Sequence, residues 1–184
     1  SFRHGAVREI LYDDLPPGRR MEIHHQVGLL LEQYGAPAPI IAAHALDSVE
    51  VAPLPAALRA IDAAVAATAD GAHSDAAQWF GRAAAAAASS GSGATVEVRA
   101  LIGGGDSLRL AGSEDQETAL FAAADAAFEL GDPALIGDAA FAVLQLGATT
   151  ESGSLHGRAI ELAGRALEVV TDPDQRALVA AGAS

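Results

Sequence analysis

HSDAAQWFGRAAAAAA, residues 73–88, is the stretch of this sequence that decides the fold. Ala76, Phe80 and Ala83 have the spacing A-x3-F-x2-A, which puts two small side chains and one aromatic ring on one face of a helix. Small residues let a neighbouring helix approach closely, and one aromatic residue per unit fills the gap between layers. The stretch therefore predicts one helix of a repeated, closely packed array.

The same spacing returns further along the chain, in a degenerate form. The later copies are Ala124, Phe128, Gly131 and, without an aromatic residue, Ala159, Ala163, Ala166. Turn signals, namely glycine, serine and Asp-Pro, divide the region into helical hairpins at 53–90, 95–131 and 133–170. The starts of these hairpins lie 42 and 38 residues apart. These periods are somewhat longer than the 34-residue tetratricopeptide unit. We predict an all-α fold of antiparallel helix pairs, stacked as a tetratricopeptide-like α-solenoid over residues 51–184.

Composition supports helices and excludes several classes of function. The chain is rich in alanine, and only 4% of its 184 residues are aromatic. Its formal net charge of −13 repels phosphate backbones and anionic lipids, so we expect neither direct nucleic-acid binding nor membrane binding. It has no cysteine, which excludes disulfides and thiolate metal sites and favours a cytoplasmic location.

The first 50 residues differ in character from the alanine-rich repeats. Apolar residues at helical spacing predict a helix over 5–14, and Pro16-Pro17 then forces a break before a second helix. Gly35 is expected to end that helix in a left-handed conformation, and a short third helix should follow around 40–45. The buried stripe expected on the second helix consists of Ile23, Val27, Leu30, Leu31 and Tyr34.

This opening segment resembles the end of the winged-helix part of STAND-class bacterial signal-transduction ATPases, which include MalT-like regulators of the LuxR type. Those proteins carry F-x-H-x-x-x-R-E-x-x-Y, a proline-marked turn and R-x-x-x-H. The matching residues here are Phe2, His4, Arg8, Glu9 and Tyr12, followed by Arg20 and His24. The resemblance continues more loosely through Ala42-Ala43-His44-Ala45 and HSDAAQWFGRA.

The resemblance implies a larger parent protein. Residues 1–50 would be a helical junction that follows a missing ATPase and winged-helix module, and residues 51–184 would be sensor repeats truncated at the C-terminus. Ser1 in place of Met fits an excised fragment. ATP or ADP would bind the parent, which would carry a DNA-binding or cyclase output domain, while this segment would bind a protein or small-molecule effector without cofactor or catalysis. His4 could contact a nucleotide phosphate in the parent, or simply start a helix.

The letters GDSL at 105–108 suggest a different class, the hydrolases that present a nucleophilic serine in this motif. Ser107 would be the nucleophile, but that family also needs D-x-x-H to supply a base, and Gly153 stands three residues before His156. We prefer a helix over 95–110 that packs Leu101, Leu108 and Ala111 inward. A GDSL-like hydrolase and a free-standing tetratricopeptide-like scaffold remain the alternatives.

Three histidines and one tryptophan are further candidates for binding sites. His24, His25 and His44 could suggest a metal site, but adjacent helical residues point about 100° apart, so we expect packing roles for His24 and His44 and no metal. Trp79 is the candidate partner-binding residue, because it stands beside Phe80 and only one of the two should be needed in the core.

Overall fold

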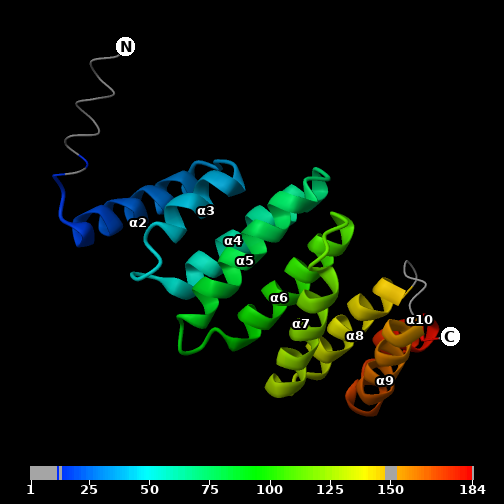
Figure 1. Ribbon diagram of the computed structural model, residues 1–184. Helices are drawn as coiled ribbons and strands as arrows, with labels where there is room; N and C mark the ends of the chain where they lie inside the picture. The colour runs from blue at the N-terminus through cyan, green and yellow to red at the C-terminus, as the bar shows by residue number, and fades with distance from the viewer. Residues whose placement is uncertain (1–11, 13, 148–152, 184) are drawn as a thin grey trace.

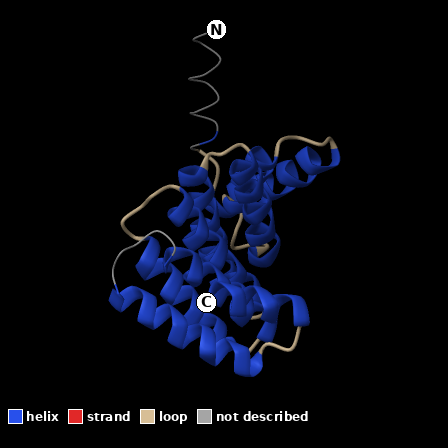
Figure 2. Cartoon of the chain, turned by 90° about the vertical axis from the view of Figure 1, so that its right-hand side faces the viewer, coloured by secondary structure: helices blue, strands red, loops and turns tan. Residues whose placement is uncertain are grey.

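The computed structural model describes residues 12, 14–147 and 153–183 (Figure 1). Every regular element in this part of the chain is an α-helix, as Figure 2 shows, which confirms the predicted all-α class. The helices are α2 (Pro17–Gln33), α3 (Ala38–Leu46), α4 (Pro53–Ala69), α5 (His73–Ala88), α6 (Ala94–Leu110), α7 (Gln116–Leu130), α8 (Pro133–Gly147), α9 (Gly153–Val169) and α10 (Pro173–Gly182). Phe2, His4, Arg8 and Glu9 of the motif lie outside the described residues, as does most of the helix expected over 5–14.

The helices stack in chain order along the molecule (Figure 1). Each helix from α2 to α9 packs on the next one, and α4, α6, α8 and α10 also pack on one another in that order. These four are therefore the first helices of successive repeats, and α5, α7 and α9 are the second helices. The first helices begin at Pro53, Ala94, Pro133 and Pro173, so the repeat length is 41, 39 and 40 residues. The stacked hairpins predicted from the sequence are confirmed.

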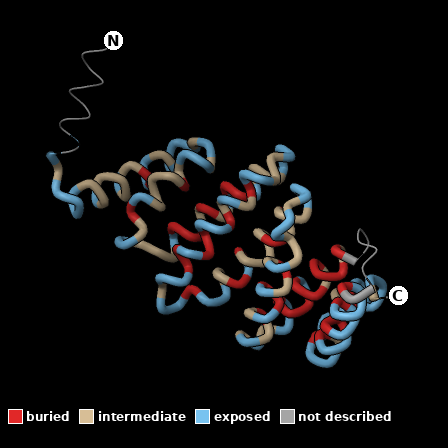
Figure 3. Tube along the Cα trace, in the orientation of Figure 1, coloured by how far each residue is buried: buried red, intermediate tan, exposed pale blue. Residues whose placement is uncertain are grey.

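The core of the repeats consists mainly of alanine, so helices approach one another closely. Ala76 and Ala83 are completely buried and Phe80 is 8% exposed, as the spacing in residues 73–88 predicted. Ala124 is also completely buried in the next second helix. Figure 3 shows that buried residues concentrate from α4 onward.

Glycines of α6 bring three helices together. A Cβ atom placed on Gly103 would lie 2.7 Å from Cε1 and Cζ of Phe80 in α5. A Cβ atom placed on Gly105 would lie 2.7 Å from Cδ2 of Leu120 in α7. Only glycine leaves room for these two side chains, so close contact accounts for Gly103 and Gly105 within a helix.

Polar caps and left-handed glycines set the ends of the helices. The Asp132 carboxylate accepts a hydrogen bond from the Ala134 N–H at 2.9 Å, and the Asp172 carboxylate accepts one from the Gln175 N–H at 2.8 Å. Gly35 has a φ of +67°, which confirms the left-handed stop expected after α2. The two Asp-Pro pairs are therefore helix starts that place a carboxylate over free N–H groups.

The buried stripe expected on α2 is wrong in part. Leu30 is 53% exposed and Tyr34 is 83% exposed, whereas the fully buried residue of this helix is Gly28. A Cβ atom on Gly28 would lie 3.7 Å from Cβ of His44, so α2 meets α3 through its glycine face. The helix packs through a small residue and leaves part of its apolar stripe uncovered.

The inward-facing residues of α6 also differ from those expected. Leu101 and Leu108 are only partly buried and Ala111 is exposed. Val98, Ala100, Gly105 and Ser107 are buried instead. The face with the smaller residues turns inward because α6 lies between α5 and α7 and is approached closely from both sides.

We expect Gly105→Ala to destabilise the chain. The new methyl group would meet Cδ2 and Cγ of Leu120 at 2.7 and 2.9 Å, and overpacking outweighs the gain in helix propensity. The net cost should be about 1–2 kcal/mol, measured by urea unfolding followed by circular dichroism. The matched control is Gly164→Ala in α9, where a Cβ atom meets nothing within 4 Å and stability should rise. Equal effects at the two positions would contradict the packing role of Gly105.

Candidate functional site

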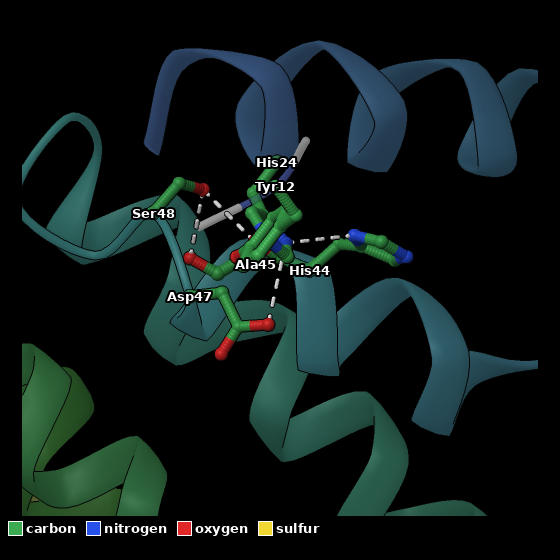
Figure 4. Close-up of polar contacts among 6 residues, drawn as sticks. All are labelled: Tyr12, His24, His44, Ala45, Asp47 and Ser48. Atoms are coloured by element: carbon green, nitrogen blue, oxygen red, sulfur yellow. Dashed lines mark hydrogen bonds and ion pairs between the residues drawn. The ribbon is translucent and has the colours of Figure 1, made fainter. Parts of the chain in front are cut away.

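The junction cluster consists of Tyr12, His24, His44, Asp47 and Ser48, and lies where α2 crosses α3 (Figure 4). The Tyr12 hydroxyl is 2.7 Å from Nε2 of His24, and Nδ1 of His24 is 3.0 Å from Nδ1 of His44. The Asp47 carboxylate also reaches Nδ1 of His24, at 3.2 Å. A chain of polar contacts therefore runs from Tyr12, which precedes the proline turn, through His24 of α2 to His44 of α3.

The histidine pair restricts the protonation of the cluster. A hydrogen bond between two Nδ1 atoms needs one N–H donor and one unprotonated acceptor. The neutral arrangement in which His24 Nδ1–H donates to His44 and Asp47 leaves Nε2 free to accept from the Tyr12 hydroxyl. Two imidazolium rings would place two donors face to face, so the contact requires at least one neutral ring.

Ser48 and Arg20 support the cluster from either side. The Ser48 hydroxyl is buried and donates to the carbonyl oxygen of His44 at 3.0 Å or of Ala45 at 3.1 Å. The Arg20 guanidinium lies 5.3 Å from the centroid of the Tyr12 ring, and its Nε donates to the Leu15 carbonyl oxygen at 2.9 Å. Arg20 thereby fixes the proline turn against Tyr12.

Three of the residues that carry the family resemblance thus come together in the structure. Tyr12 contacts both Arg20 and His24, and His24 in turn contacts His44. Both His24 and His44 take the packing roles expected for them. Among the described residues no group of three or more His, Cys, Asp or Glu is arranged to hold a metal ion, and the expectation that the chain binds no metal stays a prediction.

The first-helix face, formed by α4, α6, α8 and α10, carries two grooves on either side of Asp106. One groove of about 350 Å³ separates α4 from α6, and another of about 340 Å³ separates α6 from α8. Asp106 and Gly103 line both. A single side chain of α6 therefore stands between two hollows of similar size.

Polar contacts order this face. The Arg109 guanidinium donates to Oδ1 of Asp106 through Nε at 2.9 Å and through a terminal nitrogen at 2.7 Å. The Gln175 amide of α10 donates to Asp138 and to the Ala134 carbonyl oxygen of α8, each at 2.7 Å. Because Gln175 fills the space over Gly137, the last two first helices are joined by both packing and hydrogen bonds.

Trp79 and His4 are the two remaining candidate residues from the sequence. Trp79 is partly buried against the core, and the Arg82 guanidinium lies 4.8 Å from the centroid of its ring. Phe80 is therefore the core member of the pair, as one of the two was expected to be. His4 lies outside the described residues.

Ser107 lies within α6 and is 2% exposed. The expected helix over 95–110 is confirmed, so the GDSL letters stand inside a helix and not at a strand-to-helix turn. His156 belongs to α9, which packs on α8 and α10.

Among the helices of residues 12, 14–147 and 153–183, none combines the length and the hydropathy of a membrane span.

Sequence reasoning missed two features of these sites. The paired contact between His24 and His44 needs the crossing of α2 over α3, which no local spacing reports. The grooves beside Asp106 depend on the distance between first helices. In both places the available signal was a glycine: Gly28 lies at the junction, and Gly103 lines both grooves of the first-helix face.

We expect Tyr12→Phe to loosen the junction, because it removes the hydroxyl that contacts Nε2 of His24. The loss should be about 1 kcal/mol, the net contribution of one hydrogen bond. Amide hydrogen exchange in α2 and α3 should rise, while exchange in α8 and α9 stays the same. Tyr34→Phe is the control, since Tyr34 is 83% exposed. Unchanged exchange in α2 and α3 after Tyr12→Phe would show that the contact does not hold the junction.

No protein-family model matches the chain, and neither do the curated proteins or the solved structures with which it was compared. Its function must therefore be inferred from the residues and contacts described above.

Proposed function

We propose that the chain is a non-catalytic helical-repeat segment through which a larger STAND-type regulatory ATPase, a transcriptional regulator of the LuxR type, senses a protein or small-molecule effector in the cytoplasm. The observation that carries the proposal is the continuous stack of helices, in which the junction cluster stands at one end and the first-helix face follows. A stack of this kind can transmit a change at one site to the other through packed elements.

The first-helix face has the character of a recognition surface. Its two grooves are lined by apolar side chains together with a few polar groups, among them Asp106, Arg109 and Asp138. Apolar walls provide binding energy and ordered polar groups provide specificity. Arg109 is held by its two hydrogen bonds to Asp106, so part of the polar pattern is already ordered before an effector arrives.

The junction cluster supports the link to an upstream ATPase. Tyr12, Arg20 and His24 are the described residues of the resembling motif, and Tyr12 contacts both of the others. The exposed part of the apolar stripe on α2, Leu30 and Tyr34, is consistent with a partner surface in a larger protein. An effector that favours one arrangement of the repeats would then bias the ATPase through this end.

Nucleotide chemistry would belong to the parent and not to this segment. The chain contains no lysine, and G-x-x-x-x-G-K-[ST] requires one to reach the β- and γ-phosphates. ATP or ADP is therefore proposed only for an upstream module, and the segment is proposed to act without a cofactor of its own.

The upstream coding sequence and the full-length protein test this role. We expect a Walker motif before the position of Ser1, and we expect the purified full-length protein to bind ADP, measured by isothermal titration calorimetry. In that protein His4→Ala should change the rate of ADP release if His4 contacts the nucleotide. An upstream sequence without a nucleotide-binding motif would contradict the proposed ATPase parent. Unchanged ADP release would remove the role of His4 alone.

A further inference from the structure

A further groove lies between α5 and α7, which belong to the set of second helices. These two second helices pack on α6 from two sides, and α6 forms the floor between them. The groove has a volume of about 620 Å³, which is larger than either groove of the first-helix face. It runs along α6 from Ala100 to Ala111, which is about 16 Å at 1.5 Å per residue.

Most of the residues that line the groove are small, with Gln78 and Phe80 as the larger side chains on the α5 wall. Gly81 on α5, Ala122 on α7 and Gly104 of the floor all line the groove. A Cβ atom on Gly81 would meet no atom within 4 Å. Leu101 and Leu108 line the groove and are only partly buried, so the surface offered is apolar.

Three carboxylates flank one end of the groove. Asp75 stands beside the lining residue Ser74 in the first turn of α5, and Glu114 and Asp115 follow the lining residue Ser113 at the start of α7. All three carboxylates are exposed, and none takes part in an ion pair within the described residues. No charged side chain of either sign is among the residues that line the groove, so the three carboxylates lie beside it. The field at this end therefore attracts a cation, and the net charge of −13 adds to it at long range.

We propose that this second-helix groove binds an amphipathic α-helix of a protein partner, with its apolar side chains between α5 and α7 and with lysine or arginine residues at the end marked by Asp75, Glu114 and Asp115. The groove accommodates about three turns of such a helix, and an apolar stripe flanked by basic residues matches both its walls and its charged end. The inference rests on the proposed role as an interaction segment and adds a partner class and a second surface to it.

The probe is a short synthetic peptide with leucine at helical spacings of three and four and lysine at the other positions. It is titrated into the purified 184-residue chain by isothermal titration calorimetry. We expect binding at one peptide per chain, no binding of a peptide with every lysine replaced by glutamate, and no binding of a scrambled peptide with the same composition. The absence of binding by the lysine peptide would overturn the proposal.

Two variants locate the binding. Gly81→Leu puts a side chain into the groove from an exposed helical position and should weaken peptide binding by about tenfold or more without loss of thermal stability. Gly164→Leu in α9 makes the same change at an open position away from the groove and should leave binding unchanged. Equal affinity in the two variants would show that the peptide binds elsewhere.

Charge and self-association complete the test. Asp75→Asn with Asp115→Asn should weaken binding and reduce its salt dependence, whereas Glu161→Gln with Glu168→Gln in α9 should not. If sedimentation shows that the chain dimerises and that Gly81→Leu abolishes the dimer, a second copy occupies the groove and the proposal is wrong. Failure of the peptide experiments leaves the ATPase parent standing, because that role is tested by nucleotide binding.

Discussion

The close approach of α6 to the helices on either side is the contact on which the rest of the structure depends. The Phe80 ring lies where a side chain on Gly103 would begin, and Leu120 does the same at Gly105. Each glycine lowers the stability of the helix by about 1 kcal/mol relative to alanine. In return, the absence of a side chain lets the ring or the leucine pack directly on the backbone of α6, which adds van der Waals contacts. These two contacts join successive helices of the stack. Phe80 of α5 belongs to the hairpin of α4 and α5, and Leu120 of α7 belongs to the hairpin of α6 and α7.

The same arrangement creates the surfaces that could serve a function. Phe80 and Gly103 both line the groove between α4 and α6, and Phe80 also lines the groove between α5 and α7. The aromatic residue of the repeat thus separates the first-helix face from the second-helix groove. The first face offers ordered polar groups such as Asp106 and Arg109, and the second offers apolar walls with an acidic end. The two surfaces therefore differ in chemistry, and on the proposed function each would bind a different partner.

Much of the fold could be predicted from the sequence because the relevant signals are local. Alanine spacing in residues 73–88 predicted the buried face of α5, and Asp-Pro pairs predicted the starts of α8 and α10. The predictions that failed concern which face of a helix finds a partner. Leu30 and Tyr34 follow the helical period, yet periodicity cannot report that α3 packs on Gly28 instead. Nor could spacing reveal that His24 and His44 pair across two helices.

A double-mutant cycle on Phe80 and Gly103 tests the central contact most directly. The chain, Gly103→Ala, Phe80→Leu and the double variant are unfolded in urea, and the four free energies give the coupling between the two positions. Gly103→Ala should destabilise the chain when the ring is present, because its methyl group would lie 2.7 Å from two ring carbons. In the Phe80→Leu background the same change should be close to neutral or stabilising, which gives a coupling of about 1–2 kcal/mol. A coupling near zero would contradict the account, because it would show that α5 and α6 do not depend on the fit between the ring and the glycine.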